Sequence, residues 1–332
     1  MMDIPLSLTR ILEYGASVHG STTVTTWHGE GTGSEFDPAE EVTFRDIAAR
    51  AAAFAHAIHD DLDITGDERV GSFMWNCAEH LEVMFGTACK GAIFAPLNKQ
   101  LMNDQIRHII NHAEISAIVC DPRLAQQLGK VLVGTDSVKS VIITGAQPAQ
   151  QFAHLFPRGI EVYSYEALID GRSTVYDWPE LDERTAAALC YSTGTTGAPK
   201  GVLYSHRSLY LEAMQLRSSD SLCITHGETF LCCIPICHVL SWGVPFTCFM
   251  TGTPLVLPDA DVSAPTLAKA IAATSPRVAH GVPTIWIQLF VHYMHHPPER
   301  MTLTEIYAGG SPVPPTLIKM LSLIHISEPT RL

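Results

Sequence analysis

The sequence predicts an α/β protein built on mainly parallel sheets. Short, continuous apolar runs alternate along the chain with longer segments whose apolar residues recur at helical spacing. Strands of this kind are typical of sheets that carry helices on both faces. Hydrophobic residues make up 46% of the 332 residues and charged residues 17%, which indicates a heavily buried globular chain rather than a disordered one.

The first half of the chain shows this alternation clearly. Thr43 is a helix-capping residue type, and the apolar residues that follow it predict a helix through Ala57. Two further helices are expected around residues 81–88 and 106–113. Buried strands are expected at residues 92–95, 117–120, 141–143 and 186–190.

The second half repeats the pattern. Strands are expected at residues 202–204, 230–234, 255–257, 277–280 and 304–308, and helices at 208–216, 240–250, 264–273 and 284–294. Residues 26–41 and 173–185 are the expected surface loops. The first loop contains Gly29, Gly31 and Gly33, but we expect no strand before it and no helix after it, so it lacks the context of a dinucleotide-binding fingerprint.

Charge and composition exclude several classes of protein. A net charge of −13 argues against non-specific nucleic-acid binding. Residues 229–258 contain no Asp, Glu, Lys or Arg, yet prolines and glycines interrupt them, which favours a buried strand, helix and strand over a membrane span. The first 20 residues carry Asp3, Arg10 and Glu13 among their apolar positions and do not read as a signal peptide.

Nine cysteines are present without a CxxC pair, and most of them lie in apolar runs. This pattern predicts buried free thiols and a reducing, cytoplasmic location. Cys232, Cys233, Cys237 and His238 have metal-ligand chemistry, but a core strand followed by a bend explains their spacing better than a metal site does.

The strongest functional signal is the segment from Tyr191 to Gly201, YSTGTTGAPKG. Its glycines let backbone N–H groups turn inward, its hydroxyls add neutral donors, and Lys200 adds one mobile positive charge. This composition predicts a polyphosphate-binding loop at the carboxyl end of a strand. It is not a P-loop, because Pro199 interrupts the helix that a P-loop requires and Gly201 stands where Ser or Thr would follow the lysine.

YSTGTTGAPKG resembles the phosphate-binding signature of the acyl-adenylate-forming, or AMP-binding, superfamily. Residues 42–46, 90–98, 234–239 and 307–312 resemble further motifs of that superfamily in the same order, so the resemblance spans about residues 40–320. Residues 80–82, 111–114 and 241–245 look like its medium- and long-chain fatty acyl-CoA synthetases, although Cys237 stands where those members often carry Phe. The resemblance implies the large N-terminal domain of the adenylate-forming fold.

The activity that the resemblance implies is ATP-dependent activation of a fatty acid to an acyl-adenylate, followed by thioester formation with CoA. ATP, Mg²⁺, CoA and a fatty acid are the implied cofactors and substrates, and a second copy of the chain is a partner to consider. An aryl or short-chain acid–CoA ligase stays open as an alternative function. A non-catalytic nucleotide-binding module is the alternative from a different class of protein.

The resemblance also implies roles for individual residues. Lys200 and His238 are the implied catalytic residues, Ser192 is an implied Mg²⁺ ligand, and Trp242 and Val282 are implied gate or pocket residues for the acyl group. For His238 a hydrogen-bonded core histidine, and for Trp242 an aromatic filling a helix bend, are the alternative interpretations. The nucleotide is expected to contact Ser192, Thr193, Gly194, Thr195, Thr196, Gly197, Lys200, Gly309, Gly310 and Ser311.

Residues 321–331, LSLIHISEPTR, resemble the translation of a sequencing adapter. We therefore expect residues 1–320 to form a truncated, partial N-terminal AMP-binding domain and residues 321–332 to be a non-native tail. On this expectation the chain lacks the Mg²⁺-binding glutamate, the ribose-binding aspartate and the C-terminal lid domain with its lysine, all of which the resemblance places further along.

A chain without those groups is expected to show no appreciable turnover. Purified residues 1–320 should not catalyse fatty-acid-dependent exchange between ATP and labelled pyrophosphate, because too few groups stabilise charge on the transferring phosphate. Clear acid-dependent exchange would contradict this expectation.

Overall fold

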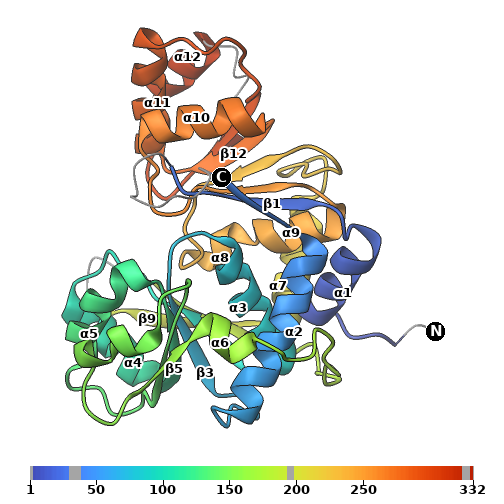
Figure 1. Cartoon of the computed structure of the whole chain (residues 1–332). Coiled ribbons are helices and arrows are strands. Elements are labelled where there is room, and N and C mark those ends of the chain that lie inside the picture. Colours follow the sequence, from blue (N-terminus) through green and yellow to red (C-terminus); the bar gives the residue numbers. More distant parts are fainter. Residues whose placement is uncertain (1–2, 30–38, 193–197, 324–329, 332) are drawn as a thin grey trace.

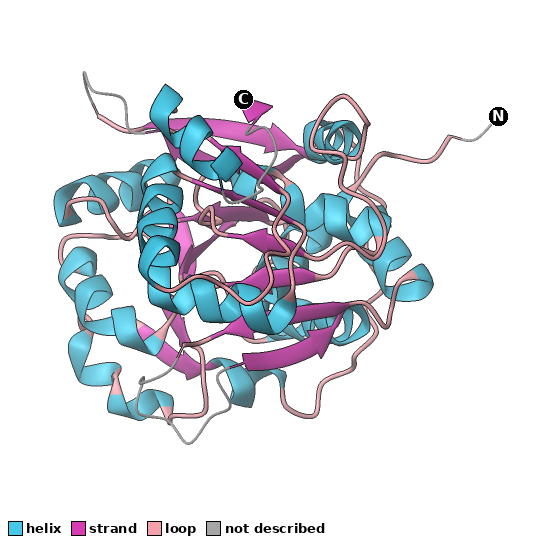
Figure 2. Cartoon of the chain, turned by 90° about the horizontal axis from the view of Figure 1, so that it is seen from above, coloured by secondary structure: helices cyan, strands magenta, loops and turns pink. Residues whose placement is uncertain are grey.

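The computed structural model describes residues 3–29, 39–192, 198–323 and 330–331. Two seven-stranded sheets alternate with three layers of helices, which gives a five-layer arrangement (Figure 1). Seen from above, the strands run through the interior with helices around them (Figure 2). The expected α/β class with mainly parallel sheets is confirmed.

Sheet A has the strand order β14-β13-β12-β10-β11-β1-β2. Neighbouring strands run parallel except in the antiparallel pair β1–β2, and β1 pairs with β11 through Val24 opposite Leu255. The sheet therefore joins the beginning of the chain to its second half. Its strands are β1 (Thr23–Trp27), β2 (Ala39–Thr43), β10 (Phe230–Cys232), β11 (Leu255–Leu257), β12 (Val278–Gly281), β13 (Glu305–Ala308) and β14 (Thr330–Arg331).

Sheet B has the order β7-β6-β5-β3-β4-β8-β9 and is built from the intervening stretch of chain. The pair β8–β9 is an antiparallel hairpin, and the other neighbours run parallel. Its strands are β3 (Arg69–Phe73), β4 (Ile93–Pro96), β5 (Ile115–Cys120), β6 (Ser140–Ile143), β7 (Glu161–Ser164), β8 (Ala186–Ser192) and β9 (Lys200–Ser205).

The helices fall into three groups, each with its own core cluster. The outer face of sheet A carries α10 (Ala264–Thr274), α11 (Pro283–His295) and α12 (Pro315–Leu323). The outer face of sheet B carries α4 (Asn103–Ala113) and α5 (Ala125–Leu132). The central layer contains α1 (Leu8–Val18), α2 (Phe44–Asp60), α3 (Ala78–Lys90), α6 (Tyr165–Ile169), α7 (His206–Leu216), α8 (Val239–Trp242) and α9 (Val244–Thr251).

Local sequence explains how the central layer begins. Thr43 caps α2 through a reciprocal pair of hydrogen bonds with Asp46: the Asp46 N–H donates to Thr43 Oγ1 at 3.2 Å, and the Thr43 N–H donates to the Asp46 carboxylate at 2.9 Å. The first residue of α2, Phe44, stacks on Phe249 of α9 with ring centroids 3.9 Å apart. The cap thus fixes where the helix starts, and the aromatic pair fixes where it packs.

Two expectations are corrected. A strand does precede the glycines at 29–33, since β1 ends at Trp27. The next element along the chain is β2, an antiparallel partner of β1, rather than a crossover helix. Gly31 and Gly33 lie outside the described residues. The single helix expected at 240–250 is two pieces separated by Gly243. The α-helices and strands that were not expected from the sequence are α1, α5, α6, α12, β1, β2, β3, β7 and β14. Strands β1 and β2 occupy both ends of the stretch 26–41 that was expected to be a surface loop.

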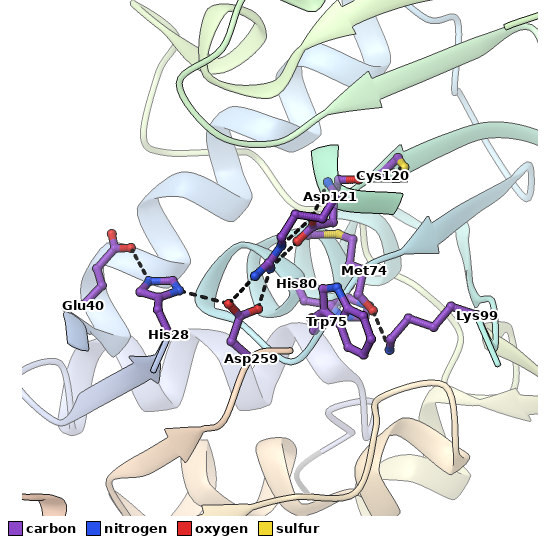
Figure 3. A network of polar contacts seen from close by, with 10 residues as sticks. His28, Glu40, Met74, Trp75, His80, Lys99, Cys120, Asp121 and Asp259 are labelled. Carbon is purple, nitrogen blue, oxygen red and sulfur yellow. Dashed lines mark hydrogen bonds and ion pairs between the residues drawn. The ribbon is translucent and has the colours of Figure 1, made fainter. Parts of the chain in front are cut away.

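A partly buried ion network joins the two sheets, and the buried Asp259 is its centre (Figure 3). Asp259 follows β11 of sheet A and accepts two hydrogen bonds, at 2.9 and 2.8 Å, from the guanidinium of Arg123, which follows β5 of sheet B. On its other side Asp259 lies 3.0 Å from Nδ1 of His28 at the end of β1. Arg123 also binds Asp121 at 2.6 Å, so this cation bridges carboxylates from both sheets.

The network shifts the titration of its members. The hydrogen bond to Asp259, followed by that to Glu40, raises the pKa of His28 to about 9. Burial acts to raise the pKa of Asp259, but the hydrogen bonds from His28 and Arg123 outweigh it and the net pKa is lowered. His28 is therefore a cation at neutral pH and forms an ion pair with Asp259.

A second link between the two sheets is made by hydrogen bonds of Asn76, which follows β3 of sheet B. Its amide nitrogen donates to the carbonyl groups of Cys232 and Ile234 at the end of β10, at 3.1 and 2.8 Å. Its amide oxygen accepts the N–H of Ile236 at 3.1 Å. One buried amide thus satisfies three backbone groups of the opposite sheet.

Replacing His28 tests the ion network through pH. The raised pKa means that the ion pair stabilises the fold fully below about pH 6.5 and that this contribution is lost as pH rises through about 9. His28→Gln should therefore be about 1–2 kcal/mol less stable than wild type at pH 6, after allowance for solvent screening, and nearly equal to it at pH 9.5. Urea unfolding at both pH values measures the difference.

The exposed His154 provides the matched control, since His154→Gln should leave the difference near zero at both pH values. A stability gap for His28→Gln that is the same at pH 6 and pH 9.5 would refute the ion-pair account.

Candidate active site

A cavity of about 840 Å³ lies where the carboxyl ends of strands from both sheets meet. In parallel sheets, the residues that follow successive strands gather at one edge, and ligands bind there. Sheet A contributes the segments after β10, β11, β12 and β13, and sheet B the segments after β3 and β4. Lining residues from these segments include Ile234, Asp259, Val282 and Gly310 from sheet A and Trp75, Asn76 and Lys99 from sheet B.

The structure brings four of the predicted site residues together in this cavity: His238, Trp242, Val282 and Gly310. Val282 is the N-cap residue of α11, which places it directly after β12. Gly310 has φ of +83°, a conformation that favours glycine. Gly309 is buried, and a Cβ at this position would lie 2.7 Å from the indole of Trp242. Gly309 therefore lets the tryptophan pack on the backbone.

The predicted phosphate loop connects β8 to β9 along the chain, and its described ends belong to these two strands. Ser192 ends β8 and pairs with Lys200, the first residue of β9, and Ser192 Oγ donates to the Lys200 carbonyl at 3.4 Å. Both residues are exposed. Thr193, Gly194, Thr195, Thr196 and Gly197 lie outside the described residues. Because β8 pairs in parallel with β4, the hairpin extends from the same edge of sheet B as the loop that carries Lys99.

Neither Lys200 nor Ser192 is among the described residues that line the cavity, and neither are Gly309 and Ser311. Ser311 is exposed just after Gly310. The structure thus groups the predicted acyl-site residues Trp242 and Val282 with His238 and Gly310 in one cavity. It places the described ends of the phosphate loop on the β8–β9 hairpin.

The segment before Gly243 is a left-handed turn. Val239, Leu240, Ser241 and Trp242 have φ values of 48°, 55°, 56° and 56°. Such a conformation costs each non-glycine residue about 1–2 kcal/mol. Consecutive strained residues persist only where surrounding contacts determine them, and they are concentrated at functional sites. This turn is the physical reason why the expected continuous helix at 240–250 is broken.

A buried hydrogen-bond cluster holds the turn. Ser241 Oγ donates to the Ile234 carbonyl at 2.6 Å, and the Ile234 N–H donates to Nδ1 of His280 at 3.3 Å. With Nδ1 accepting, His280 carries its proton on Nε2, which donates to the Ser241 carbonyl at 3.1 Å. Burial lowers the pKa of His280 to about 4, so the ring is neutral at physiological pH. Trp242 packs edge-on against this ring, with centroids 5.4 Å apart.

Residues that sequence reasoning missed complete the cavity wall. The ammonium of Lys99 lies 4.0 Å from the ring centroid of Trp75 and donates to the Met74 carbonyl at 3.1 Å (Figure 3). His238 is exposed, and the pKa of its ring is lowered first by desolvation and then by the positive charge of Lys99. The available signal for Lys99 was its position three residues after a buried strand end, at the ligand-binding edge.

Two further findings concern metals and membranes. Within the described ranges, no group of three or more His, Cys, Asp or Glu side chains is arranged to hold a metal ion. The uncharged stretch 229–258 is divided among β10, α8, α9 and β11, and no helix in the described part of the chain is long and apolar enough to span a membrane.

Comparison with solved structures defines the fold class. The anthranilate CoA ligase AuaEII in complex with anthranoyl-AMP matches 97% of this chain and 59% of its own length, with a TM-score of 0.83 and 20% sequence identity. A long-chain-fatty-acid-CoA ligase from Archaeoglobus fulgidus matches 99% of this chain and 64% of its own length, with a TM-score of 0.81 and 21% identity. At such identities the likeness concerns the fold. It is the fold of the N-terminal domain of adenylate-forming enzymes.

Sequence comparison then gives the family. The model of the AMP-binding enzyme family matches residues 14–327, and the chain belongs to this family. A medium-chain-fatty-acid–CoA ligase of Ectopseudomonas oleovorans is 31% identical over 98% of this chain and 58% of its own length. A 3-methylmercaptopropionyl-CoA ligase of Ruegeria lacuscaerulensis is 31% identical over 96% and 57%. The chain thus spans less than two thirds of these relatives.

Removing the hydroxyl of Ser241 should destabilise the fold. Ser241→Ala leaves the buried carbonyl of Ile234 without its 2.6 Å donor and releases the left-handed turn. The Ile234 carbonyl keeps its 2.8 Å hydrogen bond from the Asn76 amide, so the variant loses one buried hydrogen bond, and the free energy of unfolding in urea should fall by about 0.5–1.5 kcal/mol. The exposed Ser17 gives a control, because Ser17→Ala should change stability by less than about 0.5 kcal/mol. Equal stabilities for the two variants would show that the cluster does not hold the turn.

Proposed function

We propose that this chain supplies the nucleotide- and acid-binding part of an acid–CoA ligase that activates a fatty acid with ATP. The observation that carries the proposal is the single cavity, at the carboxyl edges of both sheets, that collects His238, Trp242, Val282 and Gly310. Membership of the AMP-binding enzyme family and the acid–CoA ligase names of the relatives support it.

The proposed reaction has two steps. A carboxylate oxygen of the acid forms a bond to the α-phosphorus of ATP while the bond to the bridging oxygen breaks, and pyrophosphate leaves. The CoA sulfur then attacks the acyl carbon, loses its proton, and displaces AMP. Such a reaction depends on aligning the reactants and stabilising charge on the phosphates.

In this scheme the β8–β9 hairpin binds the polyphosphate. Lys200 is an exposed cation at the base of the loop, and Ser192 to Gly197 supply hydroxyl and backbone donors. Mg²⁺ would neutralise the phosphate oxygens, and the exposed hydroxyl of Ser192 is an oxygen ligand of the kind that Mg²⁺ takes beside substrate phosphates. Gly309, Gly310 and Ser311 would bind the nucleotide from the end of β13.

The acyl group would lie in the cavity. Trp242, Val282 and Ile285 give it apolar walls, and Trp242 is half-buried at the strained turn, which suits a gate residue. His238 lies exposed in the same cavity, where it would contact the reacting carboxylate or the adenylate. The nine free cysteines support a reducing, cytoplasmic location as part of this proposal.

One observation favours a shorter or more polar acid as the second candidate. The cavity wall includes Gln100, Thr284 and Gln288 besides its apolar residues, so part of the wall can hydrogen-bond to a ligand. An aryl or short-chain acid would place polar atoms there more readily than a long alkyl chain.

Stable analogues of the acyl-adenylate test the proposal on the chain itself. Octanoyl-sulfamoyl-adenosine, benzoyl-sulfamoyl-adenosine and AMP are titrated into the protein by calorimetry. If the cavity holds both acyl group and nucleotide, the octanoyl analogue should bind at least about a hundredfold more tightly than AMP, because the two parts of the ligand share one entropy cost. Tighter binding of the benzoyl analogue would favour the aryl alternative. Equal binding of all three would favour a nucleotide-binding module.

A Lys200 variant tests the phosphate loop separately from the cavity. Lys200→Met should weaken MgATP binding by about tenfold or more while leaving the octanoyl analogue unaffected, since that analogue carries no β- or γ-phosphate. Lys139 is an exposed lysine elsewhere in the fold, and Lys139→Met controls for the loss of one positive charge.

A further inference from the structure

Lys99 is a buried lysine in the wall of the cavity, and its surroundings leave it short of partners. The residue is 8% exposed. Its ammonium group has three N–H donors, and the described residues give it one acceptor, the Met74 carbonyl at 3.1 Å. The Lys99 nitrogen also lies 4.0 Å from the ring centroid of Trp75, over the face of the indole (Figure 3). Two of the three donors therefore lack an acceptor in the described part of the protein.

The positive charge of Lys99 is also uncompensated at close range. No carboxylate of the described residues lies within 4.0 Å of its nitrogen. Asp259 and Asp121, whose charges reach Lys99 from further away, are both engaged by Arg123. A buried, unpaired ammonium is costly, and an anionic ligand is the partner that would remove this cost.

A second donor in the same wall is unsatisfied. The indole N–H of Trp75 is buried and has no hydrogen-bond acceptor among the described residues. Lysine and tryptophan side chains bring donors and no acceptors. Lys99 therefore leaves donors without an acceptor at this point of the wall, although the carboxylates of Asp259 and Asp261 line the same cavity. Beside an ammonium, the acceptor that binds best is an anionic oxygen.

The rest of the cavity indicates what would carry that oxygen. Among its described lining residues, Lys99 is the one lysine or arginine, and Trp242, Val282 and Ile285 provide apolar surface. A ligand that matches both features has an oxyanion joined to an apolar body. His238 lines the same cavity, and the charge of Lys99 lowers the pKa of this histidine, so the two groups act on the same space.

We propose that Lys99, set against Trp75, forms an oxyanion subsite that determines which ligands the cavity accepts. The group bound is an anionic oxygen, carried either by a carboxylate of the acid or by a phosphate of a nucleotide cosubstrate. Where the source is the acid, the subsite selects amphiphilic acids whose carboxylate reaches Lys99 while the hydrocarbon part contacts the apolar wall. The inference deepens the proposed function, since it names a specificity residue of the same cavity.

Binding measurements on the full chain test the subsite without any turnover. Octanoate, octanedioate and inorganic pyrophosphate are titrated by calorimetry into wild type, Lys99→Met and Lys99→Arg. Lys99→Met removes the charge and keeps the stem, so octanoate or octanedioate should bind at least about tenfold more weakly, and Lys99→Arg should restore most of the affinity. Loss of pyrophosphate binding instead would support the subsite and identify phosphate as the source of the oxyanion.

Lys90 provides a matched control. It is a lysine of α3 that is 6% exposed and does not line the cavity, so Lys90→Met should bind all three probes as wild type does. Circular dichroism and urea unfolding verify that each variant folds, and Lys99→Gln replaces Lys99→Met if the latter does not. Unchanged affinity of the folded Lys99 variants for all three probes would overturn the subsite.

The outcome is independent of the test of the proposed function. If the acyl-adenylate analogues fail to bind while Lys99→Met still loses carboxylate binding, the subsite stands and the ligase proposal falls. If the analogues bind equally well to wild type and Lys99→Met, and no anion probe is affected, the ligase proposal stands and the subsite falls.

Discussion

The contacts of Asp259 with Arg123 and His28 are the interaction on which the site depends. The cavity has walls from two separate sheets, so its shape follows from how the sheets sit against each other. Asp259 belongs to sheet A and also lines the cavity, while Arg123 belongs to sheet B. A carboxylate that accepts hydrogen bonds from two cations fixes both distance and orientation, which apolar packing between helices does less strictly. The amide of Asn76 adds uncharged hydrogen bonds between the two sheets.

Strain and compact packing coincide in another part of the cavity wall, at Trp242. The left-handed turn that ends at Trp242 directs the indole toward Gly309, where a side chain would collide with it. Hydrogen bonds made by the fully buried His280 and Ser241 hold this turn in place. The cavity thus has one wall fixed by charge and another fixed by neutral hydrogen bonds around a strained backbone. Rigid walls of this kind preorganise a site for a ligand.

Much of the fold follows from local sequence. Continuous apolar runs such as residues 117–120 predict strands, and Thr43 with Asp46 predicts a helix start. Strand β3 was not predicted because Arg69, Gly71 and Ser72 interrupt its apolar character. Gly71 is needed where a Cβ would lie 3.1 and 3.2 Å from Ile115 and Ile118 of the neighbouring strand, a constraint that the local pattern does not show.

The candidate site likewise has a part that the sequence predicts and a part that it does not. The loop at 191–201 and the residues near His238 and Gly310 carry recognisable local patterns. The residues of the left-handed turn carry no local signal for that conformation. The hydrogen-bond partners of Asp259 and Lys99 follow other strands, 136 and 25 residues away in the sequence, so the pairing of the strands brings these groups together.

The pairing of β1 with β11 has a consequence for biosynthesis. Val24 and Leu255 are neighbours in sheet A although about 230 residues separate them along the chain, and all of sheet B lies between them. At a synthesis rate of about 5–20 residues per second, the first hairpin waits on the order of 10–50 s before its parallel neighbour exists. Sheet B can assemble in that interval, while the open edge of β1 stays available to other chains. The ribosome-bound chain is therefore the stage at which this strand edge is open to pairing with another chain.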